Sequence, residues 1–244
     1  MIGIIGYGVV GKAVANGFGK TAILLSDPKY NDLSIEYMCS KSPEAIFVCV
    51  PTPTDDTNYS IVKDVLRRIS QTGYGNLVVV KSTILPEHLE GFDVIYNPEF
   101  LSRSSANEDF VNPPFVLIGG PRAEELVEIY RKYSTVNLHK VLVTDIKTAA
   151  MAKYVMNTFY ATKVTFMNQM YDVAQQLGVD WKHVTTIVSN NPWMGTHHFD
   201  VPGPDGQRGF GGPCLPKDTE AIVKKFDVEL LKTVLELNSK YRHD

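Results

Sequence analysis

The sequence feature that most restricts the fold is a glycine-rich turn near the start of the chain, GYGVVG from Gly6 to Gly11. An apolar segment at Ile2–Ile5 predicts a strand before this turn, and Gly11–Gly17 predicts a helix after it. Between a strand and a helix, three glycines allow a tight turn, close approach of a pyrophosphate and close helix–strand packing. The helix N-terminus then presents free N–H groups to the phosphates. We therefore predict that Gly6, Gly8 and Gly11 bind a dinucleotide, the alternative being a glycine turn in an unrelated α/β protein.

An acidic residue stands where a dinucleotide-binding fold needs one. Asp27 follows a predicted strand at Ala22–Ser26, about 20 residues after the glycine turn. A carboxylate there accepts hydrogen bonds from the ribose hydroxyls of NAD and repels the 2′-phosphate of NADP. The sequence therefore favours NAD as the cofactor, although Lys29 lies close by and acts in the opposite sense.

The first part of the chain alternates between predicted strands and helices. Further apolar segments predict strands at Ala45–Val50, Leu77–Lys81, Val94–Tyr96, Val116–Ile118 and Val141–Val143, and helices at Ile61–Ile69 and Glu124–Tyr133. This alternation predicts a parallel sheet joined by right-handed crossovers. We therefore expect an α/β fold whose first domain, residues 1–146, is a Rossmann-type NAD-binding domain.

From residue 147 the pattern changes to that of an all-helical domain, residues 147–244. Lys147–Leu177 holds no glycine or proline and keeps helical spacing, which predicts one long central helix of about 46 Å. Its apolar residues exceed the needs of one face, so the helix is either buried in the domain or shared across a homodimer interface. A helix at Asp180–Ser189, a loop at 192–216 rich in proline and glycine, and a helical stretch to about Tyr241 follow.

Composition and charge restrict the class of protein further. The 244 residues carry a net charge of −3, which predicts no nucleic-acid partner. Apolar runs are far shorter than the roughly 20 residues that span a membrane. The three cysteines, Cys39, Cys49 and Cys214, argue against a disulfide framework and favour a reducing, cytoplasmic location. The pair His197-His198 has no cysteine or carboxylate array beside it, so we expect no metal site.

The segment GFGGPCLPKD, from Gly209 to Asp218, carries the clearest chemistry. Its glycines keep the backbone close and leave the thiol of Cys214 reachable, and Pro216 suits the first turn of a following helix. A thiol at a helix N-terminus and near Lys217 is a good nucleophile because the thiolate is favoured there. The alternative is a structural cysteine in a loop.

A second polar group lies on the predicted long helix. Lys153 and Asn157 are four residues apart and share one face. Both donate hydrogen bonds, so together they would stabilise a developing oxyanion. A solvated polar stripe is the usual explanation for such a pair. Two further segments, Lys81–Thr83 and Tyr96–Leu101, follow predicted strands, where open α/β sheets bind their ligands.

Together these motifs resemble the UDP-glucose/GDP-mannose dehydrogenase family. In chain order the matching segments are GYGVVG, VCVPTP, VVVKST, YNPEFL, Asp109-Phe110, AKYVMN and GFGGPCLPKD, and they cover nearly the whole chain. The last segment is specific to the family. The pair Lys153 and Asn157 is not, because related hydroxyacid and phosphogluconate dehydrogenases place a similar pair on a similar helix.

The resemblance implies NAD-dependent, four-electron oxidation of a sugar C6 alcohol to the carboxylate through a cysteine thioester. Cys214 would attack the aldehyde intermediate, and Lys153 and Asn157 would hold the oxyanion. Asp218 would position water and assist proton transfer. The resemblance also implies that Thr83 joins the Asp218 network, that Glu99 is a base in hydrolysis and that Phe100 and Leu101 line the sugar site. The residues it implies for NAD contact are Val10, Asp27, Thr52 and Lys217. Thr83 could instead only cap a helix. Apart from the resemblance, we assign Arg208 and Gly211 of the long loop to substrate binding; Arg208 would meet a phosphate, the alternative being a solvated side chain.

The chain also departs from the family pattern. The family normally continues into a C-terminal nucleotide-binding domain, whereas this chain stops at Asp244, so we expect much of the uridine-diphosphate site to be missing. Ser102–Ser104 replaces Arg-Glu-Gly, Trp193–Gly195 replaces Arg-Ile-Gly, and Ala150 replaces a glutamate. The leading hypothesis is oxidation of UDP-glucose to UDP-glucuronate. The alternatives are a two-electron hydroxyacid-type dehydrogenase and a non-catalytic NAD-binding subunit that needs a partner domain.

Overall fold

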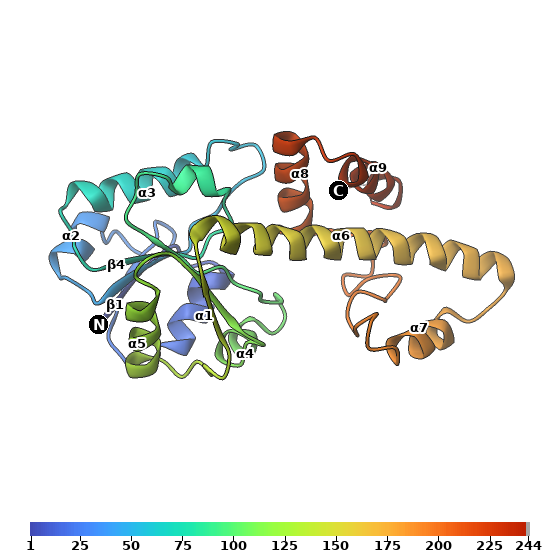
Figure 1. Cartoon of the computed structure of the whole chain (residues 1–244), viewed down its shortest axis with the longest axis horizontal. Coiled ribbons are helices and arrows are strands. Elements are labelled where there is room, and N and C mark those ends of the chain that lie inside the picture. The colour runs from blue at the N-terminus through green and yellow to red at the C-terminus, as the bar shows by residue number, and fades with distance from the viewer. Residues whose placement is uncertain (243–244) are drawn as a thin grey trace. The chain divides into compact units, whose positions relative to one another are not determined.

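The computed structural model describes residues 1–242, which form two compact units, the first Met1–Lys153 and the second beginning at Tyr154 (Figure 1). The last two residues of the expected helical domain, His243 and Asp244, lie outside the described residues. The long helix α6 (Ile146–Leu177) contributes its first two turns to the first unit and the rest to the second.

The first unit is built on a seven-stranded sheet in the order β2-β1-β3-β4-β5-β6-β7. Its strands are β1 (Ile2–Ile5), β2 (Ile23–Ser26), β3 (Ala45–Val48), β4 (Leu77–Val80), β5 (Ile95–Tyr96), β6 (Val116–Gly119) and β7 (Val141–Thr144). The central strands β1, β3 and β4 are buried along their whole length, as expected for parallel strands covered on both faces. The predicted Rossmann-type α/β fold is therefore confirmed.

Helices cover both faces of this sheet. They are α1 (Val9–Gly17), α2 (Ile35–Ser40), α3 (Ser60–Gln71), the 3₁₀ turn η1 (Pro86–Leu89), α4 (Ala106–Val111) and α5 (Ala123–Tyr133). Figure 1 shows α2 and α3 on one face, and α1, α4 and α5 on the other. On the second face Phe18 packs against Phe47 and Tyr130, with ring centroids 5.1 Å and 5.4 Å apart.

The sheet differs from the expected all-parallel arrangement at one pairing. β5 and β6 are antiparallel, with Tyr96 opposite Gly119, whereas β6 and β7 are parallel to each other. A parallel crossover needs a connection that carries the chain back across the sheet. The only helix between β5 and β6 is α4, with six residues, and it rises only about 9 Å. The antiparallel pairing means that β6 starts at the edge of the sheet where β5 ends, so residues 97–115 do not carry the chain back across the sheet.

This reversal explains how the long helix reaches the carboxyl ends of the first strands. Because β7 runs opposite to β5, the chain leaves β7 at the other edge of the sheet and α6 starts there. Lys153 is the eighth residue of α6, so it lies about 10 Å along the helix from its start. That distance returns Lys153 to the loop that follows β5.

Within residues 154–242, the regular structure of the second unit is entirely helical. After α6 come α7 (Trp181–Ser189), α8 (Leu215–Phe226) and α9 (Glu229–Tyr241). The predicted single helical stretch at the end of the chain is thus two helices, because Asp227 adopts a left-handed conformation (φ 55°) that ends α8. An aspartate there is a weaker break signal than glycine. No helix in residues 1–242 combines the length and apolar character that a membrane crossing requires.

Candidate functional site

The glycine turn has the geometry of a phosphate cradle. Gly6 has φ +90°, and a Cβ on it would lie 2.7 Å from the carbonyl oxygen of Cys49. A Cβ on Gly11 would lie 2.0 Å from the carbonyl oxygen of Gly6, so α1 packs too closely against the turn for any side chain at this position. A Cβ on Gly8 would meet nothing within 4 Å. Gly6 and Gly11 are therefore required by the fold, while Gly8, the N-cap of α1, leaves open space that suits a pyrophosphate.

The carboxylate of Asp27 lies directly beside this turn. Its Oδ2 accepts a hydrogen bond from the backbone N–H of Tyr7 at 2.6 Å, and its Oδ1 accepts one from the N–H of Lys29 at 2.8 Å. Both oxygens are thus oriented by the backbone. Val10, half-buried in the first turn of α1, and Thr52, buried just after β3, complete the residues assigned to the cofactor in this unit. Their contacts with NAD stay predictions.

Lys12 was not expected to belong to this region. Its ammonium lies 5.7 Å from the ring centroid of Tyr7 and 5.4 Å from that of Tyr30, and the two rings pack edge to face. The contact with Tyr30 raises the pKa of Lys12. The only sequence signal was the position of Lys12 in the first turn after the glycines.

The residues after β5 meet Lys153. The Lys153 ammonium donates to the carbonyl oxygen of Glu99 at 2.6 Å and to its carboxylate Oε1 at 3.3 Å. The other carboxylate oxygen accepts from the N–H of Leu101 at 2.6 Å, and the ring of Phe100 lies 5.1 Å from the ammonium. The side chains of Lys153 and Glu99 are only 5% and 10% exposed. The sequence placed these residues on separate segments, and the fold brings Lys153, Glu99, Phe100 and Leu101 together.

A buried polar network lies next to this pair. Lys81, at the end of β4, donates to Oδ1 of Asn97 at 2.9 Å, and the same oxygen accepts from the hydroxyl of Tyr130 at 2.7 Å. Burial lowers the pKa of the Lys81 ammonium to about 8, and the charge of Lys153 acts in the same direction. Thr83 lies two residues further on and is half-buried. The sequence predicts Tyr130 only as a residue of a helix, because no local pattern indicates the hydrogen-bond partner of its hydroxyl.

In the second unit, Cys214 is exposed and forms the N-cap of α8. Its carbonyl oxygen accepts from the N–H of Asp218 at 2.9 Å, and Pro216 lies in the first turn, as predicted. The carboxylate of Asp218 is buried, with a side-chain exposure of 1%. It accepts from Nδ2 of Asn157 at 2.5 Å and pairs with the ammonium of Lys217. Asn157, Lys217 and Asp218 therefore meet in the first turn of the helix that Cys214 begins.

Arg208 and Gly211, both assigned to the substrate, have partners within this unit. The guanidinium of Arg208 donates to Oδ1 and the carbonyl oxygen of Asn168, and it pairs with Asp172 at 2.8 Å. That pairing lowers the pKa of Asp172. Gly211 lies against the guanidinium of Arg242. A contact between either residue and a substrate stays a prediction.

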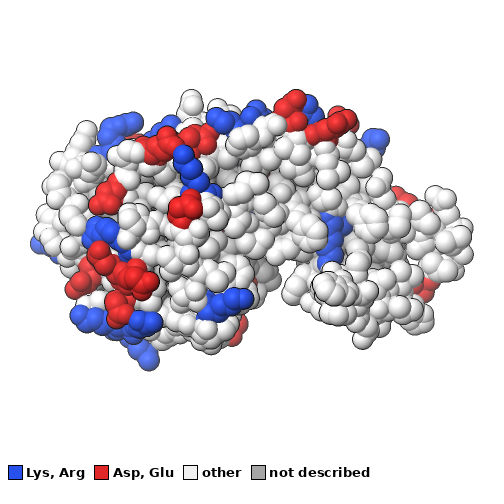
Figure 2. All heavy atoms as spheres, viewed as in Figure 1, with Lys and Arg blue, Asp and Glu red and all other residues white. Residues whose placement is uncertain are grey.

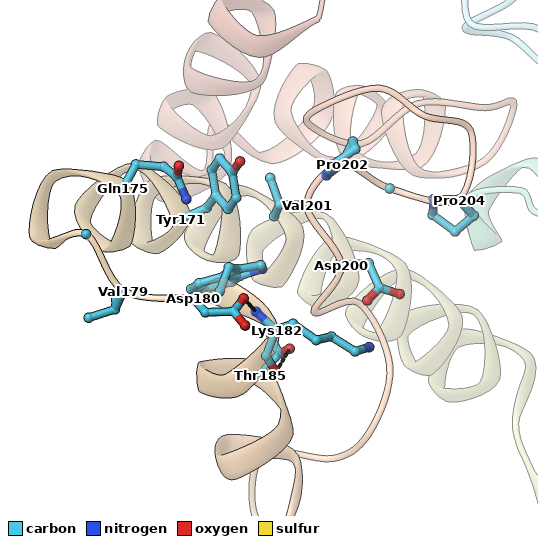
Figure 3. A pocket seen from close by; sticks show the side chains of 13 residues that line it. Tyr171, Gln175, Val179, Asp180, Lys182, Thr185, Asp200, Val201, Pro202 and Pro204 are labelled. Carbon is cyan, nitrogen blue, oxygen red and sulfur yellow. Dashed lines mark hydrogen bonds between the residues drawn. The ribbon is translucent and has the colours of Figure 1, made fainter.

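A wide hollow of about 830 Å³ in the second unit lies elsewhere. It is lined by residues of α6, α7 and the loop before Pro204, among them Tyr171, Trp181 and Asp200 (Figure 3). None of the residues that the sequence assigned to chemistry lines it. This hollow is therefore separate from the residues that carry the predicted chemistry.

Charge and metal-ligand chemistry add two observations. On the face shown in Figure 2, lysine and arginine side chains lie among aspartate and glutamate side chains, mainly at the left and along the top of the view. Within residues 1–242, no three histidine, cysteine, aspartate or glutamate side chains are grouped so that they could hold a metal ion.

The fold and the glycine turn define an NAD-binding protein of the Rossmann class. The chain belongs to the UDP-glucose/GDP-mannose dehydrogenase family: residues 31–137 match its NAD binding domain and residues 147–240 match its central domain.

The relatives show both the likeness and its extent. The chain is 32% identical over 220 residues to the UDP-glucose 6-dehydrogenase of Rickettsia bellii, covering 81% of this chain and 50% of that protein. It is 31% identical over 226 residues to the GDP-mannose 6-dehydrogenase of Pseudomonas aeruginosa, covering 79% and 50%. A solved UDP-glucose dehydrogenase from the archaeon Pyrobaculum islandicum has a TM-score of 0.81 at 28% identity, covering 98% of this chain and 68% of that one. The chain spans about half the length of the curated relatives it matches.

The open space at Gly8 leads to a direct test of the cofactor site. We expect Gly8→Ala to fold with an unchanged melting temperature, because the new Cβ meets no protein atom within 4 Å. We expect its affinity for NAD to fall at least about tenfold, because the methyl group occupies the space of the pyrophosphate. Calorimetric titration with NAD measures the affinity. Gly75→Ala is the matched control, since a Cβ there also meets nothing within 4 Å. Equal NAD affinity in the Gly8 variant and the control would contradict the assignment.

Proposed function

We propose that this chain oxidises the C6 alcohol of a nucleotide sugar, with UDP-glucose as the substrate, to the carboxylate in an NAD-dependent reaction. The observation that carries the proposal is the exposed Cys214 at the start of α8, one turn from a buried carboxylate held by Asn157 and Lys217. The family-specific segment around Cys214 and the family membership of the chain support it.

The proposed chemistry runs in two oxidations. NAD, which the glycine turn and Asp27 would hold, would supply the hydride acceptor for each oxidation. After the first, the thiolate of Cys214 adds to the aldehyde carbon, and the carbonyl oxygen becomes the oxyanion of a thiohemiacetal. Hydride loss from that carbon gives a thioester, which water hydrolyses to release the carboxylate and the thiol. Covalent capture holds the reactive aldehyde between the steps.

The remaining groups have roles that follow from their chemistry. Lys153 and Asn157 are hydrogen-bond donors and would stabilise the oxyanion. Glu99 is a carboxylate held by Lys153 and by the N–H of Leu101, and it would take the proton of the attacking water. Asp218 would position that water, and Thr83 would join its network. Phe100 and Leu101 would line the sugar.

Two other functions make different predictions. An NAD-binding subunit that acts only with a partner chain predicts NAD binding without turnover until the partner is added. A two-electron hydroxyacid-type oxidation would instead yield one NADH per substrate and would be insensitive to thiol alkylation.

The stoichiometry of NADH formation tests the thioester route. We expect two NADH per molecule of UDP-glucose consumed by the unmodified chain, with GDP-mannose and UDP-N-acetyl sugars offered for comparison. We expect Cys214→Ser to form no carboxylate, because a hydroxyl cannot supply the thioester. Cys49→Ala is the control, since burial raises the pKa of the Cys49 thiol to about 12 and keeps it protonated. Full carboxylate production by Cys214→Ser would refute the route.

We also propose that the chain forms a homodimer through α6. Seven apolar side chains of α6 are at least one-third exposed: Met151, Val155, Phe159, Phe166, Met170, Val173 and Leu177. Their spacing of three, four or seven residues places them on one continuous stripe. Single exposed apolar residues are ordinary, whereas a continuous stripe of this size is typical of an interface. A second copy presents the same stripe, which makes the contact self-complementary.

Light scattering at micromolar concentration tests the dimer. We expect a mass of twice the 27.2 kDa of the chain, and a shift of Phe159→Asp to the monomer because a carboxylate in the stripe would be buried without a partner. Phe226→Asp is the control, since Phe226 is similarly exposed but lies on α8. A monomeric unmodified chain would contradict the proposal.

A further inference from the structure

The backbone just before Cys214 is fixed by side chains from two helices of the second unit. Asn168 of α6 accepts the N–H of Gly209 at 3.1 Å. Asn238 of α9 accepts the N–H of Phe210 at 2.7 Å through Oδ1 and donates from Nδ2 to the carbonyl oxygen of Phe210 at 2.9 Å. One side-chain amide thus satisfies both polar groups of a single peptide residue. Only one orientation of the amide allows both bonds.

The backbone of the loop packs closely against the end of α9. Gly209 has φ +71°, and a Cβ on it would lie 2.4 Å from Oδ1 of Asn238. A Cβ on Gly211 would lie 2.0 Å from Cζ of Arg242. The guanidinium of Arg242 also pairs with Asp205, with Nη2 2.6 Å from Oδ2. Gly209 and Gly211, the first and second glycines of the GFGG segment, therefore lie directly against Asn238 and Arg242 at the end of α9.

The helix α9 presents one face to this loop. Val234, Asn238 and Tyr241 are spaced by four and three residues, which places them on the same side of the helix. Val234 is buried in a cluster with Phe210, and Tyr241 stacks on Arg208 at 4.3 Å. Asn238 thus occupies a position in an apolar face, where a side-chain amide is retained only if it is hydrogen-bonded.

The residues that follow the fixed segment are exposed. A Cβ on Gly212 would meet nothing within 4 Å, and Gly212, Pro213 and Cys214 are all exposed. At Leu215 the helix α8 begins. Cys214 is therefore held between the backbone anchored at Phe210 and the start of a helix, with a short exposed link between them.

We propose that Asn238 is a positioning residue for the nucleophile Cys214, acting through the backbone of Phe210. The inference deepens the proposed function, since it assigns a support to the cysteine used there. Loss of the amide frees the segment before Cys214, so the thiol no longer keeps its place at the N-cap of α8. Because a thiol at a helix N-terminus gains reactivity from that position, its reactivity falls when the position is lost.

The rate of alkylation of Cys214 by iodoacetamide measures this directly and needs neither NAD nor sugar. Peptide mass spectrometry separates Cys214 from Cys39 and Cys49. Because Cys214 is already exposed, loosening the loop adds little accessibility, and the rate reports the population of thiolate. We expect the rate at pH 7 to fall at least about fivefold in Asn238→Ala. We expect a similar fall in Asn238→Asp, which keeps the acceptor for the Phe210 N–H but turns a carboxylate oxygen toward the Phe210 carbonyl.

Asn190→Ala is the matched control. Asn190 lies at the C-cap of α7 in the same unit, and its amide also donates to a backbone carbonyl, that of Thr186, at 2.8 Å. If Asn238 has only a structural role, Asn238→Ala and Asn190→Ala both have lower melting temperatures, and Cys214 in both reacts at the rate of the unmodified chain. The positioning role predicts a slower Cys214 reaction in the Asn238 variants alone, with NAD affinity unchanged. A Cys214 rate in Asn238→Ala that is within twofold of the unmodified chain, or higher, overturns the proposal.

The outcome is separable from that of the proposed function. If the unmodified chain forms no NADH with any sugar while Asn238→Ala still slows the alkylation of Cys214, the oxidation fails and the positioning role stands. If two NADH form per sugar and the Asn238 variants keep the Cys214 rate, the oxidation stands and the positioning role fails.

Discussion

The two largely buried carboxylates, Glu99 and Asp218, each require charged and hydrogen-bonding partners around them. A buried charge is tolerated only when it is paired and hydrogen-bonded. Glu99 is held by Lys153 and by a backbone N–H, and Asp218 is held by Lys217 and Asn157. The charged partners come from α6 in one unit and α8 in the other. Removing either lysine would leave an unpaired carboxylate, so the residues proposed for catalysis are also required for packing.

Close approach and hydrogen bonding of loop backbone explain why glycine and asparagine recur near the candidate site residues. Gly6, Gly11 and Gly209 let backbone or side-chain oxygens approach to distances that any Cβ would prevent. Asn97, Asn168 and Asn238 each accept at least one hydrogen bond through Oδ1 and donate one through Nδ2. An amide can satisfy a donor and an acceptor at once without carrying charge. These residues fix loops that regular backbone hydrogen bonding leaves open.

Local patterns predicted a large part of this structure. The glycine turn, the apolar strands and the uninterrupted helix α6 each follow from short-range periodicity, and the family segments located Cys214, Lys153 and Glu99. The antiparallel β5–β6 pairing was missed because the direction of a strand depends on the path of the connecting segment, which no local pattern reports. The break at Asp227 was missed because the segment has no glycine or proline. The network of Lys81, Asn97 and Tyr130 joins residues from three elements, which no local pattern reports. Asn238, in contrast, has a local signal in the sequence, because it is a polar residue on an apolar helix face.

The central claim is that Cys214 becomes covalently attached to the sugar, and the most direct measurement is the mass of its peptide. Glu99→Gln, mixed with NAD and UDP-glucose and quenched in acid, should carry an added sugar acyl group on Cys214, because loss of the base slows hydrolysis of the thioester. Hydroxylamine should remove the added mass, as it does for thioesters. Formation of the carboxylate product while Cys214 is never modified would contradict the account.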